Sequence, residues 1–423
     1  MLRLNRLDAK RRPMISTQDR LDLEAAAQRI ALKKMNELPS DPGTIQPRLP
    51  TGGAFKDLFM GDTATTCMWA MHFGDAFPVT ESLDHFYRLQ DEDGFINRQF
   101  QPNGQPKFLK GHPVSWGMIL LAWAESELYA LRGDRQRLAK VYPHLKRHHE
   151  YCRKTFRMED GLYTGCPLGC GMDNLPRWPT GWKDDGKGIK LREAFVGPGV
   201  EINKWIRHYL DSDAYAWNLQ GRFIDMSGQM AMDARFLGEM AEVLGHAADA
   251  AVWRAEHAEL GDRINERMWH EELGAYVDLG YGEWIPHLHI GGFWPLLAGI
   301  VPGERLPRVI DLLTDERHFG RPTPVPSLAA SDPDYTEGGK YWRGGTWAPT
   351  NYMVLKGLAL NGAMDVAKAI ARKYVAAVNQ VFRETGTFWE NYDPERRAQG
   401  GMSAPDFVGW SGLAAVSIPR EFL

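Results

Sequence analysis

The amino-acid sequence predicts an all-α fold, an (α/α)6 toroid in which helical hairpins close into a barrel. Two observations carry this prediction. Apolar segments alternate with amphipathic segments about five or six times along the chain, which is typical of paired inner and outer helices. The connections between pairs are long and rich in glycine, proline and tryptophan. We expect them, with small β-hairpins, to build a pocket at one mouth of the toroid.

The N-terminal part begins with a short basic arm over residues 1–16, which we expect to be flexible and to precede a single catalytic domain of residues 17–423. Apolar residues at helical spacing predict a first helix over 18–37, with Thr17 as a plausible cap. Asp62 is a candidate N-cap of the next helix, a structural role that weighs as much as any role in a site.

The later segments follow the same alternation. Pro113 opens a long apolar helix that ends near Gly133, and a polar, basic partner follows over 134–157. The remaining apolar and amphipathic segments are 224–245 with 247–269, 290–300 with 304–315, 346–361 with 363–384, and 408–418. The long connections are 158–201, 274–289, 317–345 and 385–407. Alternating residues from Gly274 to Gly280 predict a small hairpin.

Composition narrows the class of function. The net charge of −4 over 423 residues argues against a nucleic-acid or membrane-surface partner. We see no apolar run as long as a membrane span and no secretory signal, and the four cysteines are typical of buried small residues. We therefore expect a cytoplasmic protein. Aromatic residues make up 11% of the chain, with 15 tryptophans, many of them in the connections. Aromatic rings stack on sugar rings, so a small carbohydrate is the expected partner. The oligomeric state is not indicated.

Two carboxylates stand in contexts that suit glycosidic bond hydrolysis, which usually needs a proton donor and a second acid that attacks or activates water. Asp173 lies between Gly171 and Pro176, which favour an irregular loop. Trp178 and Trp182 follow it as candidate sugar-stacking residues. An aspartate that accepts backbone hydrogen bonds in a turn is the simpler interpretation.

Glu390 is the second candidate. Trp389 precedes it and could shield it from water, and Asn391 follows and could hold it. A salt-bridge partner in a loop is the equally weighted alternative. Only a fold such as the toroid would bring Glu390 close to Asp173.

A third stretch has the character of a clamp for a sugar or carboxylate. Arg343 is flanked in the sequence by the aromatic residues Tyr341, Trp342 and Trp347. The glycines beside it let the backbone approach a ligand closely. A cation–π element of the core is the alternative. Farther along, Trp410 is a candidate floor of the pocket.

These stretches resemble glycoside hydrolase family 63, in particular its bacterial mannosylglycerate hydrolase-like and glucosylglycerate hydrolase-like branch, which is related to the trehalases. The motifs that carry the resemblance, in the same order, are Gly171-Met-Asp-Asn174, Tyr341-Trp-Arg-Gly344 with Trp347, Trp389-Glu-Asn-Tyr392 with Pro394, and Phe407-Val-Gly-Trp-Ser-Gly412. The resemblance runs from about Asp57 to Trp410. Each motif is short, but four in order are specific.

The resemblance implies an (α/α)6 barrel and an inverting α-glycosidase that uses no cofactor and no metal. By it, Asp173 is the general acid and Glu390 the general base. It also implies that Asp62 grips the non-reducing sugar and that Trp342, Arg343 and Trp347 form a sugar-binding clamp. The remaining candidate substrate-binding residues are Phe59, His112, Trp389 and Tyr392.

The chain departs from the family pattern in places. Gly61 stands where a tryptophan often precedes the sugar-gripping aspartate, so we expect extra space there and an uncertain glucose preference. The connection from Lys187 to Trp217 is rich in cations and could recognise an anionic aglycone such as glycerate. A solvated surface loop is the favoured alternative for that connection. Glu421 is a second candidate base, close to the chain end.

Two other functions stay open from the sequence. A sugar epimerase or isomerase could use the same toroid with histidines as acid and base, and His287, His289 and His112 are the candidates. A metal is not expected at the first two, because the sequence shows no third clustered ligand. A non-catalytic sugar-binding protein would keep the aromatic pocket and tolerate the loss of both carboxylates.

Overall fold

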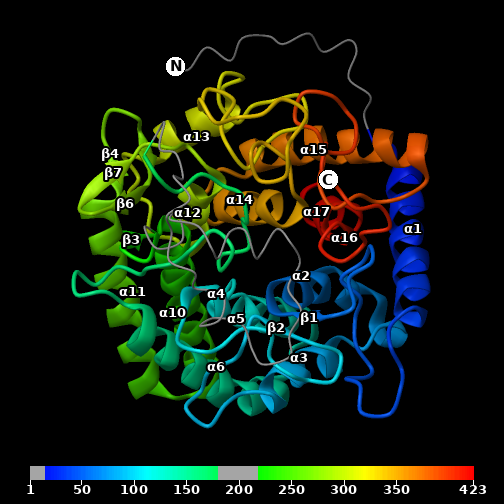
Figure 1. Ribbon diagram of the computed structural model, residues 1–423, viewed down its shortest axis with the longest axis horizontal. Coiled ribbons are helices and arrows are strands. Elements are labelled where there is room, and N and C mark those ends of the chain that lie inside the picture. Colours follow the sequence, from blue (N-terminus) through cyan, green and yellow to red (C-terminus); the bar gives the residue numbers. More distant parts are fainter. Residues whose placement is uncertain (1–14, 180–217) are drawn as a thin grey trace, which may run out of the picture.

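The computed structural model describes residues 15–179 and 218–423, and these are mostly helical (Figure 1). The helices of the first half are α1 (Thr17–Asn36), α2 (Met60–Ala70), η1 (Met71–Ala76), α3 (Val79–Arg88), α4 (Pro113–Trp116), α5 (Leu121–Arg132) and α6 (Arg135–Phe156). Those of the second half are α10 (Ile224–Leu244), α11 (Ala247–Arg267), η2 (Ile290–Phe293), α12 (Trp294–Ala298), α13 (Leu306–Thr314), α14 (Ala348–Leu360), α15 (Met364–Thr385), α16 (Gly412–Ala415) and α17 (Ser417–Phe422).

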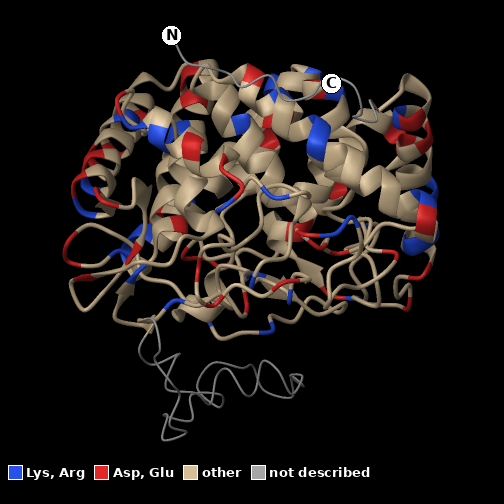
Figure 2. Ribbon diagram, turned by 90° about the horizontal axis from the view of Figure 1, so that it is seen from above, with Lys and Arg blue, Asp and Glu red and all other residues tan. Residues whose placement is uncertain are grey.

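The strands are short and antiparallel. They are β1 (Leu58–Phe59), β2 (Gln99–Phe100), β3 (Gly221–Arg222), β4 (Trp269–His270), β5 (Ala275–Tyr276), β6 (Asp278–Gly280) and β7 (Glu283–Ile285). β1 pairs with β2 so that Leu58 lies opposite Phe100. β4 pairs with β5, and β6 lies between β3 and β7. The strands and long connections gather on one side of the helices (Figure 2).

The buried helices contact one another in a closed cycle, which runs α2, α5, α10, α12, α14, α16 and back to α2. In α2 every residue except Asp62 is buried. Longer helices with one polar face, among them α1, α6, α11 and α15, lie toward the periphery (Figure 1). The partners α10 and α11 are consecutive in the chain and pack on each other, as do α14 and α15. The repeated alternation of the sequence is therefore an alternation of inner and outer helices.

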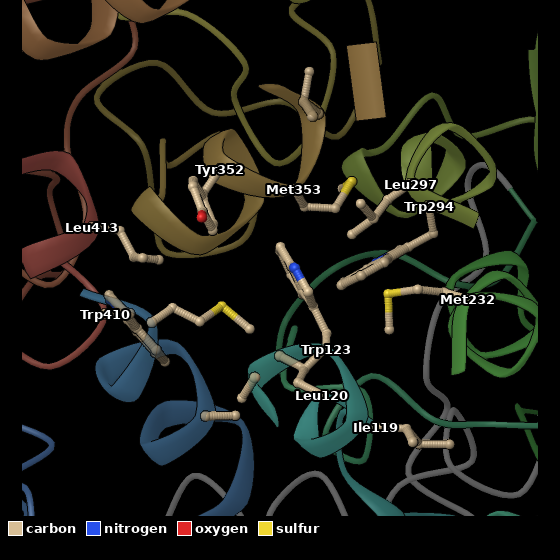
Figure 3. Close-up of a cluster of buried hydrophobic side chains, with 14 of the residues drawn as sticks. Ile119, Leu120, Trp123, Met232, Trp294, Leu297, Tyr352, Met353, Trp410 and Leu413 are labelled. Carbon is tan, nitrogen blue, oxygen red and sulfur yellow. The ribbon is translucent and has the colours of Figure 1, made fainter. Parts of the chain in front are cut away.

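Aromatic side chains fill the space inside this cycle (Figure 3). Trp123 of α5 stacks on Tyr352 of α14, with ring centroids 5.5 Å apart and an interplanar angle of 11°. Its other side meets the edge of Trp294 of α12 at 6.4 Å. Offset stacking and edge contacts of this kind add to the burial of large apolar surfaces. Many of the tryptophans therefore belong to the core.

The helix starts differ in part from the sequence-based expectation. α1 begins at Thr17, but its N-cap is Ser16, whose side chain accepts a hydrogen bond from the backbone N–H of Asp19 at 3.1 Å. Asp62 is not an N-cap, because α2 begins at Met60 and its cap is Phe59. Asp62 lies in the first turn of α2 instead, where the helix dipole favours a negative charge.

The expected long helix from Pro113 is wrong. The chain forms the short helix α4 and then breaks at Gly117, which has a φ of 76°. A Cβ at Gly117 would lie 2.5 Å from the Cβ of Arg98. Only glycine allows this backbone conformation and this close approach without strain. The break matters because Arg98 lies beside the cavity described below.

The expected hairpin from Gly274 to Gly280 is also wrong. Its two halves are the strands β5 and β6, which belong to different sheets. β5 pairs with β4, whereas β6 pairs with both β3 and β7. Alternation predicted strands correctly, but pairing depends on contacts distant in the sequence. Within residues 15–179 and 218–423, the structure contains no helix both long and apolar enough to cross a membrane.

Replacing Gly357 by alanine tests the packing between inner helices. A Cβ at this position of α14 would lie 2.7 Å from the Cβ of Leu296 and 2.9 Å from the backbone N of Leu297. Alanine favours an exposed helix by about 1 kcal/mol over glycine, but the overlap is expected to lower the free energy of unfolding by about 1–3 kcal/mol. Urea denaturation measures the difference.

The control for this variant is Gly303→Ala, since a Cβ there would meet nothing within 4 Å. It is expected to change stability by less than about 0.5 kcal/mol. A Gly357→Ala protein as stable as the unaltered chain would contradict the close packing of α12 against α14.

Candidate active site

A cavity of about 580 Å³ opens among the connections on the strand side of the helices. Its wall includes four carboxyl groups, of which Asp62, Asp173 and Glu390 come from distant parts of the chain and Asp57 is paired with Lys107. The other lining residues are Thr51, Ala54, Phe55, Lys56, Phe59, Gly61, Arg98, Gln99, Lys107, Phe108, Gly117, Met118, Leu168, Gly169, Gly171, Tyr341, Met402, Phe407 and Trp410. The two acids singled out from the sequence therefore face one space.

The pairing of β1 with β2 places Asp62 beside a cation. The backbone N–H of Met60 donates to the carbonyl of Arg98 at 2.9 Å, which brings the start of α2 alongside this residue. The Arg98 guanidinium lies 5.6 Å from the ring centroid of Phe108 and donates from Nη1 to the carbonyl of Leu168. Arg98 thus joins the Asp62 side of the cavity to the segment that carries Asp173.

Asp173 lies on a segment without helix or strand. The turn before it contains Gly171, whose φ of 75° favours glycine. The next residue, Asn174, fixes the segment to a distant turn that spans residues 340–343. Its side-chain oxygen accepts from the backbone N–H of Trp342 at 2.8 Å, and its amide nitrogen donates to the carbonyl of Lys340 at 3.1 Å. An irregular backbone is thereby fixed by an asparagine side chain.

Glu390 is held from both sides and is 6% exposed. One carboxylate oxygen, Oε2, accepts from the backbone N–H of Ala404 at 3.2 Å, and Oε1 accepts from the hydroxyl of Tyr341 at 3.3 Å. The indole N–H of Trp410 donates to the carbonyl of Glu390 at 2.9 Å. Tyr341 has a φ of 60°, a costly conformation for a tyrosine that the surrounding contacts must maintain.

The three carboxyl groups have raised pKa values, chiefly because burial disfavours their charged forms. The pKa is about 7 for Asp62, about 6 for Asp173 and about 7 for Glu390. The charge of Arg98 lowers the pKa of Asp62 and Asp173, whereas the other two acids raise that of Glu390 further. Near neutral pH the three groups therefore share protons, as acid–base catalysis requires.

The predicted substrate-binding residues fall into two groups. Phe59, Tyr341 and Trp410 line the cavity together with Asp62. Others stand behind the wall. Trp342 and Trp347 are buried and stack on each other at 3.9 Å, with an interplanar angle of 4°.

The expected clamp at Arg343 has a different geometry. Its Nε donates to the carbonyl of Asn174 at 3.2 Å and its Nη1 lies 3.6 Å from Asp334. Its described contacts therefore support the Asp173 segment. Trp389 donates from its indole to Thr385 at 3.1 Å, and Tyr392 is 1% exposed.

His112, Trp178 and Trp182 complete the predicted set. His112 is the N-cap residue of α4, and burial lowers its pKa. Neither His112 nor Trp178 is among the residues that line the cavity. Trp182 and the cationic connection from Lys187 to Trp217 lie outside the described residues.

The expected open space at Gly61 is filled. A Cβ at Gly61 would lie 2.5 Å from Cε of Met118, and one at Gly171 would lie 3.4 Å from the same atom. The Met118 side chain therefore fills the space between the segments that carry Asp62 and Asp173. Neither Met118 nor Arg98 was a sequence candidate, because nothing in their immediate neighbours marks a site. The break at Gly117, which brings both close to the acids, was the signal missed.

The alternative base lies elsewhere. Glu421 lines a separate cavity of about 310 Å³. Its Oε2 lies 3.0 Å from the ammonium of Lys356, and its Oε1 accepts from the hydroxyl of Tyr352 at 2.7 Å. These contacts make Glu421 part of a polar cluster against the middle of α14.

The paired histidines are also outside the cavity. His289 lies 3.2 Å from Asp278 and accepts the backbone N–H of Gly291 at 3.1 Å. His287, Asp332 and Asp334 lie close enough to hold a metal ion. However, both ring nitrogens of His287 already contact protein acceptors, so this grouping is better described as a hydrogen-bond network.

Comparisons with known proteins identify the family of the chain. Residues 65–411 match the mannosylglycerate hydrolase MGH1-like glycoside hydrolase domain. The structure is similar to the family 63 mannosylglycerate hydrolase of Thermus thermophilus in complex with glucose, with a TM-score of 0.70 and 21% identity, covering 94% of this chain and 99% of that one. At this low identity, the TM-score shows a likeness of fold alone.

Two curated relatives show the same kinship. A probable mannosyl-oligosaccharide glucosidase of Schizosaccharomyces pombe is 30% identical over 369 residues, which cover 79% of this chain and 40% of the relative. A Borreliella burgdorferi protein is 26% identical over 342 residues and is matched over 64% of its length. This chain therefore spans less than two thirds of either relative.

The match over residues 65–411 places the chain among the glycoside hydrolase domains. The chain belongs to the mannosylglycerate hydrolase MGH1-like glycoside hydrolase family.

Replacing Glu390 by glutamine is expected to stabilise the protein at pH 8 and to leave its stability nearly unchanged at pH 4.5. The folded-state pKa is about 7, whereas an unfolded glutamate titrates near about 4.3. The folded state binds more protons between these values, so stability falls as pH rises through that window. Because glutamine does not ionise, the variant avoids a decrease in the free energy of unfolding on the order of 3 kcal/mol at pH 8.

Urea unfolding at the two pH values measures this effect. The exposed Glu272 provides the control, because Glu272→Gln removes a solvated charge and is expected to change neither value by more than about 0.5 kcal/mol. Equal stabilities of Glu390→Gln and the unaltered protein at pH 8 would show that Glu390 is ionised without cost.

Proposed function

We propose that this enzyme is an inverting α-glycosidase that hydrolyses a small α-glucoside or α-mannoside. The observation that supports this most directly is the shared cavity, in which Asp173 and Glu390 meet although they are distant in the sequence. Inverting hydrolysis needs two acids on opposite faces of one sugar ring, separated by roughly 6.5–9.5 Å so that a water molecule fits between base and sugar.

In this mechanism Asp173 is the general acid and Glu390 the general base. The Asp173 carboxyl donates its proton to the glycosidic oxygen as the bond to the anomeric carbon breaks. The Glu390 carboxylate takes a proton from the attacking water, whose oxygen bonds to the opposite face of that carbon. The products are one free sugar of inverted configuration and one alcohol. The acid ends ionised and the base protonated, so one proton must return to Asp173 before the next turnover.

The surroundings bear on each role. The pKa of about 7 for Glu390 lies above the pKa of about 6 for Asp173, so in the free cavity Asp173 ionises first, and the reactive form with Asp173 protonated and Glu390 ionised is the minor one. The hydroxyl of Tyr341 and the backbone N–H of Ala404 both donate to Glu390, which favours its ionised form. Burial keeps Asp173 protonated to a higher pH than an exposed aspartate. Asp62 is the proposed grip on the non-reducing sugar, since an ionised carboxylate accepts hydrogen bonds from two hydroxyls at once.

The architecture that would position these groups is the (α/α)6 barrel. We infer it from the closed cycle of six inner helices together with their outer partners. The catalytic groups then come from the connections at one mouth, whose backbone can approach a ligand more closely than a helix can.

An anionic aglycone such as glycerate remains the finer substrate proposal. Arg98, Lys56 and Lys107 face the cavity, although Lys107 lies 3.3 Å from Asp57 and is partly neutralised by it. These cations favour a substrate that carries a negative charge on their side of the cavity. The cysteines that the structure describes are free and buried, which is compatible with a cytoplasmic location.

Single substitutions test the assignment of acid and base. Asp173→Asn and Glu390→Gln are each expected to lower kcat/KM at least about a hundredfold, because general acid or base assistance contributes that much or more. A panel of α-glucosides, α-mannosides and glycosylglycerates supplies the substrate. Sugar release by coupled assay gives the rates.

Glu421→Gln is the matched control, since it removes a partly buried glutamate from the other cavity. Its kcat/KM is expected to stay within about threefold of the unaltered value. Full activity of Asp173→Asn or Glu390→Gln would remove that residue from the mechanism. Inactivity of Glu421→Gln alone would shift the base to the other cavity.

A further inference from the structure

The segment that carries Asp173 has no helix or strand to fix it. From Cys170 to Trp178 the chain runs through turns and irregular backbone, so its position depends on side-chain contacts with other elements. Asn174 supplies one tie on the side of Tyr341. Two further ties lie on the other side of the segment, at Arg177 and Trp178.

Arg177 is the deeper tie. Its side chain is fully buried, with Nη2 2.6 Å from Asp225 and Nη1 2.9 Å from Asp278. Both carboxylates also accept backbone N–H groups at the start of α10, from Met226 at 2.9 Å and Ile224 at 2.8 Å. The positive charge is thus balanced by acids that the helix N-terminus itself holds.

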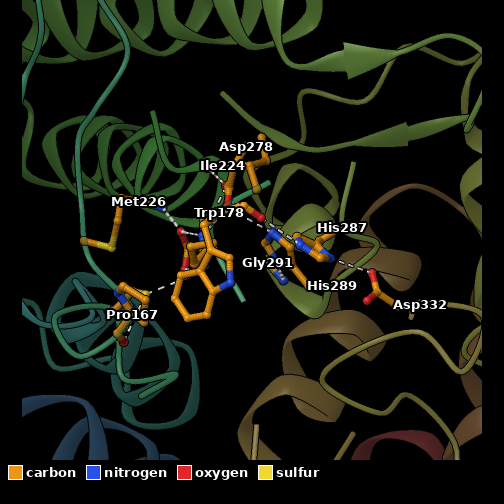
Figure 4. Close-up of polar contacts among 12 residues, drawn as sticks. Pro167, Trp178, Ile224, Met226, Asp278, His287, His289, Gly291 and Asp332 are labelled. Atoms are coloured by element: carbon orange, nitrogen blue, oxygen red, sulfur yellow. Dashed lines mark hydrogen bonds and ion pairs between the residues drawn. The ribbon is translucent and has the colours of Figure 1, made fainter. Parts of the chain in front are cut away.

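Trp178 is tied through its backbone carbonyl, and the partner is His287 (Figure 4). Nε2 of His287 lies 2.9 Å from this carbonyl oxygen, and Nδ1 lies 2.9 Å from Oδ2 of Asp332. A carbonyl and a carboxylate are both acceptors, so both ring nitrogens must donate. His287 is therefore an imidazolium in this arrangement.

The surrounding charges support that state. Burial lowers the pKa of His287, but the hydrogen bond and charge of Asp332 outweigh it, and the net pKa is raised. Asp334 adds a second negative charge 4.0 Å from Nε2, and Arg343 lies 3.6 Å from Asp334 on the other side. His289, two residues later, accepts a hydrogen bond at Nδ1, so it does not share this double-donor geometry.

We propose that His287 is a positioning residue for the general acid, because its Nε2–H holds the Trp178 carbonyl and thereby fixes the irregular segment on which Asp173 lies. This inference rests on the proposed role of Asp173. His287 itself touches no residue of the cavity wall in the contacts described, and it acts through the backbone five residues after the acid.

The effect of losing this tie falls on one step. A misplaced acid delivers its proton to the leaving oxygen less often, and an error of about 1 Å can cost up to a hundredfold in rate. Asp62, which binds the substrate, and Glu390, which activates the water, lie on other segments. These two side chains are therefore expected to keep their geometry. Arg177 is unsuitable as a test, because its removal would leave two buried carboxylates unpaired and would destabilise the fold.

Two amide variants separate the two hydrogen bonds of His287. In His287→Gln the side-chain amide nitrogen reaches the place of Nε2 and can still donate to Trp178. In His287→Asn it reaches the place of Nδ1, so the contact with Asp332 remains and the contact with Trp178 is lost. Both variants remove the same charge and one ring, and their urea unfolding midpoints show whether they are equally folded.

The rates are measured on two substrates of each variant: the glycoside hydrolysed fastest in the panel, and the α-fluoride of the same sugar, whose leaving group departs without a proton. His287→Asn is expected to lose about tenfold in kcat on the glycoside and less than about twofold on the fluoride. His287→Gln is expected to keep kcat on both within about threefold.

Equal losses in the two variants, or a loss by His287→Asn that is as large on the fluoride as on the glycoside, would overturn the proposal and leave His287 a purely structural residue. Asp173→Asn, measured alongside, distinguishes a failure of the proposed function from a failure of the positioning role of His287. If it hydrolyses the glycoside at the unaltered rate, the proposed function fails and the positioning role with it. If it is inactive while both His287 variants are fully active, the positioning role alone fails.

Discussion

The cost of ionising three carboxyl groups in one cavity governs the rest of the site. Asp62, Asp173 and Glu390 each have a pKa raised by burial, and ionising one makes it harder to ionise its neighbours. The charge of Arg98 and the two donors to Glu390 oppose this cost. The result is a set of acids that exchange protons close to neutral pH. Burying such acids lowers stability, so their presence indicates a functional site rather than a core.

The helical scaffold makes such an arrangement possible. Tryptophan and tyrosine rings close the interior of the ring of helices, while the acids lie on its strand side, on or next to irregular backbone. Each acid-bearing segment is then held by specific side chains: Asn174 and Arg177 around Asp173, and Trp410 around Glu390. Stability comes from the helices, and geometry at the cavity comes from buried polar contacts that only the folded chain can assemble.

Much of this could be predicted from the sequence. Alternating apolar and amphipathic segments predicted the paired helices, and short motifs predicted that Asp173 and Glu390 would meet. The sequence could not show that Arg98 and Met118 face the acids, because their positions depend on the end of helix α4 at Gly117. Nor could it distinguish an aromatic on the cavity wall from one behind it, and Trp347 is fully buried. Local pattern reveals residue type and period, but side-chain direction depends on tertiary packing.

Proton NMR of the first sugar released from an α-linked substrate tests the central claim most directly. If Glu390 activates a water on the face opposite the leaving group, the β-anomer must appear first and then equilibrate with the α-anomer. Initial release of the α-anomer would mean that a carboxylate attacks the sugar directly, and the roles assigned here to Asp173 and Glu390 would be wrong.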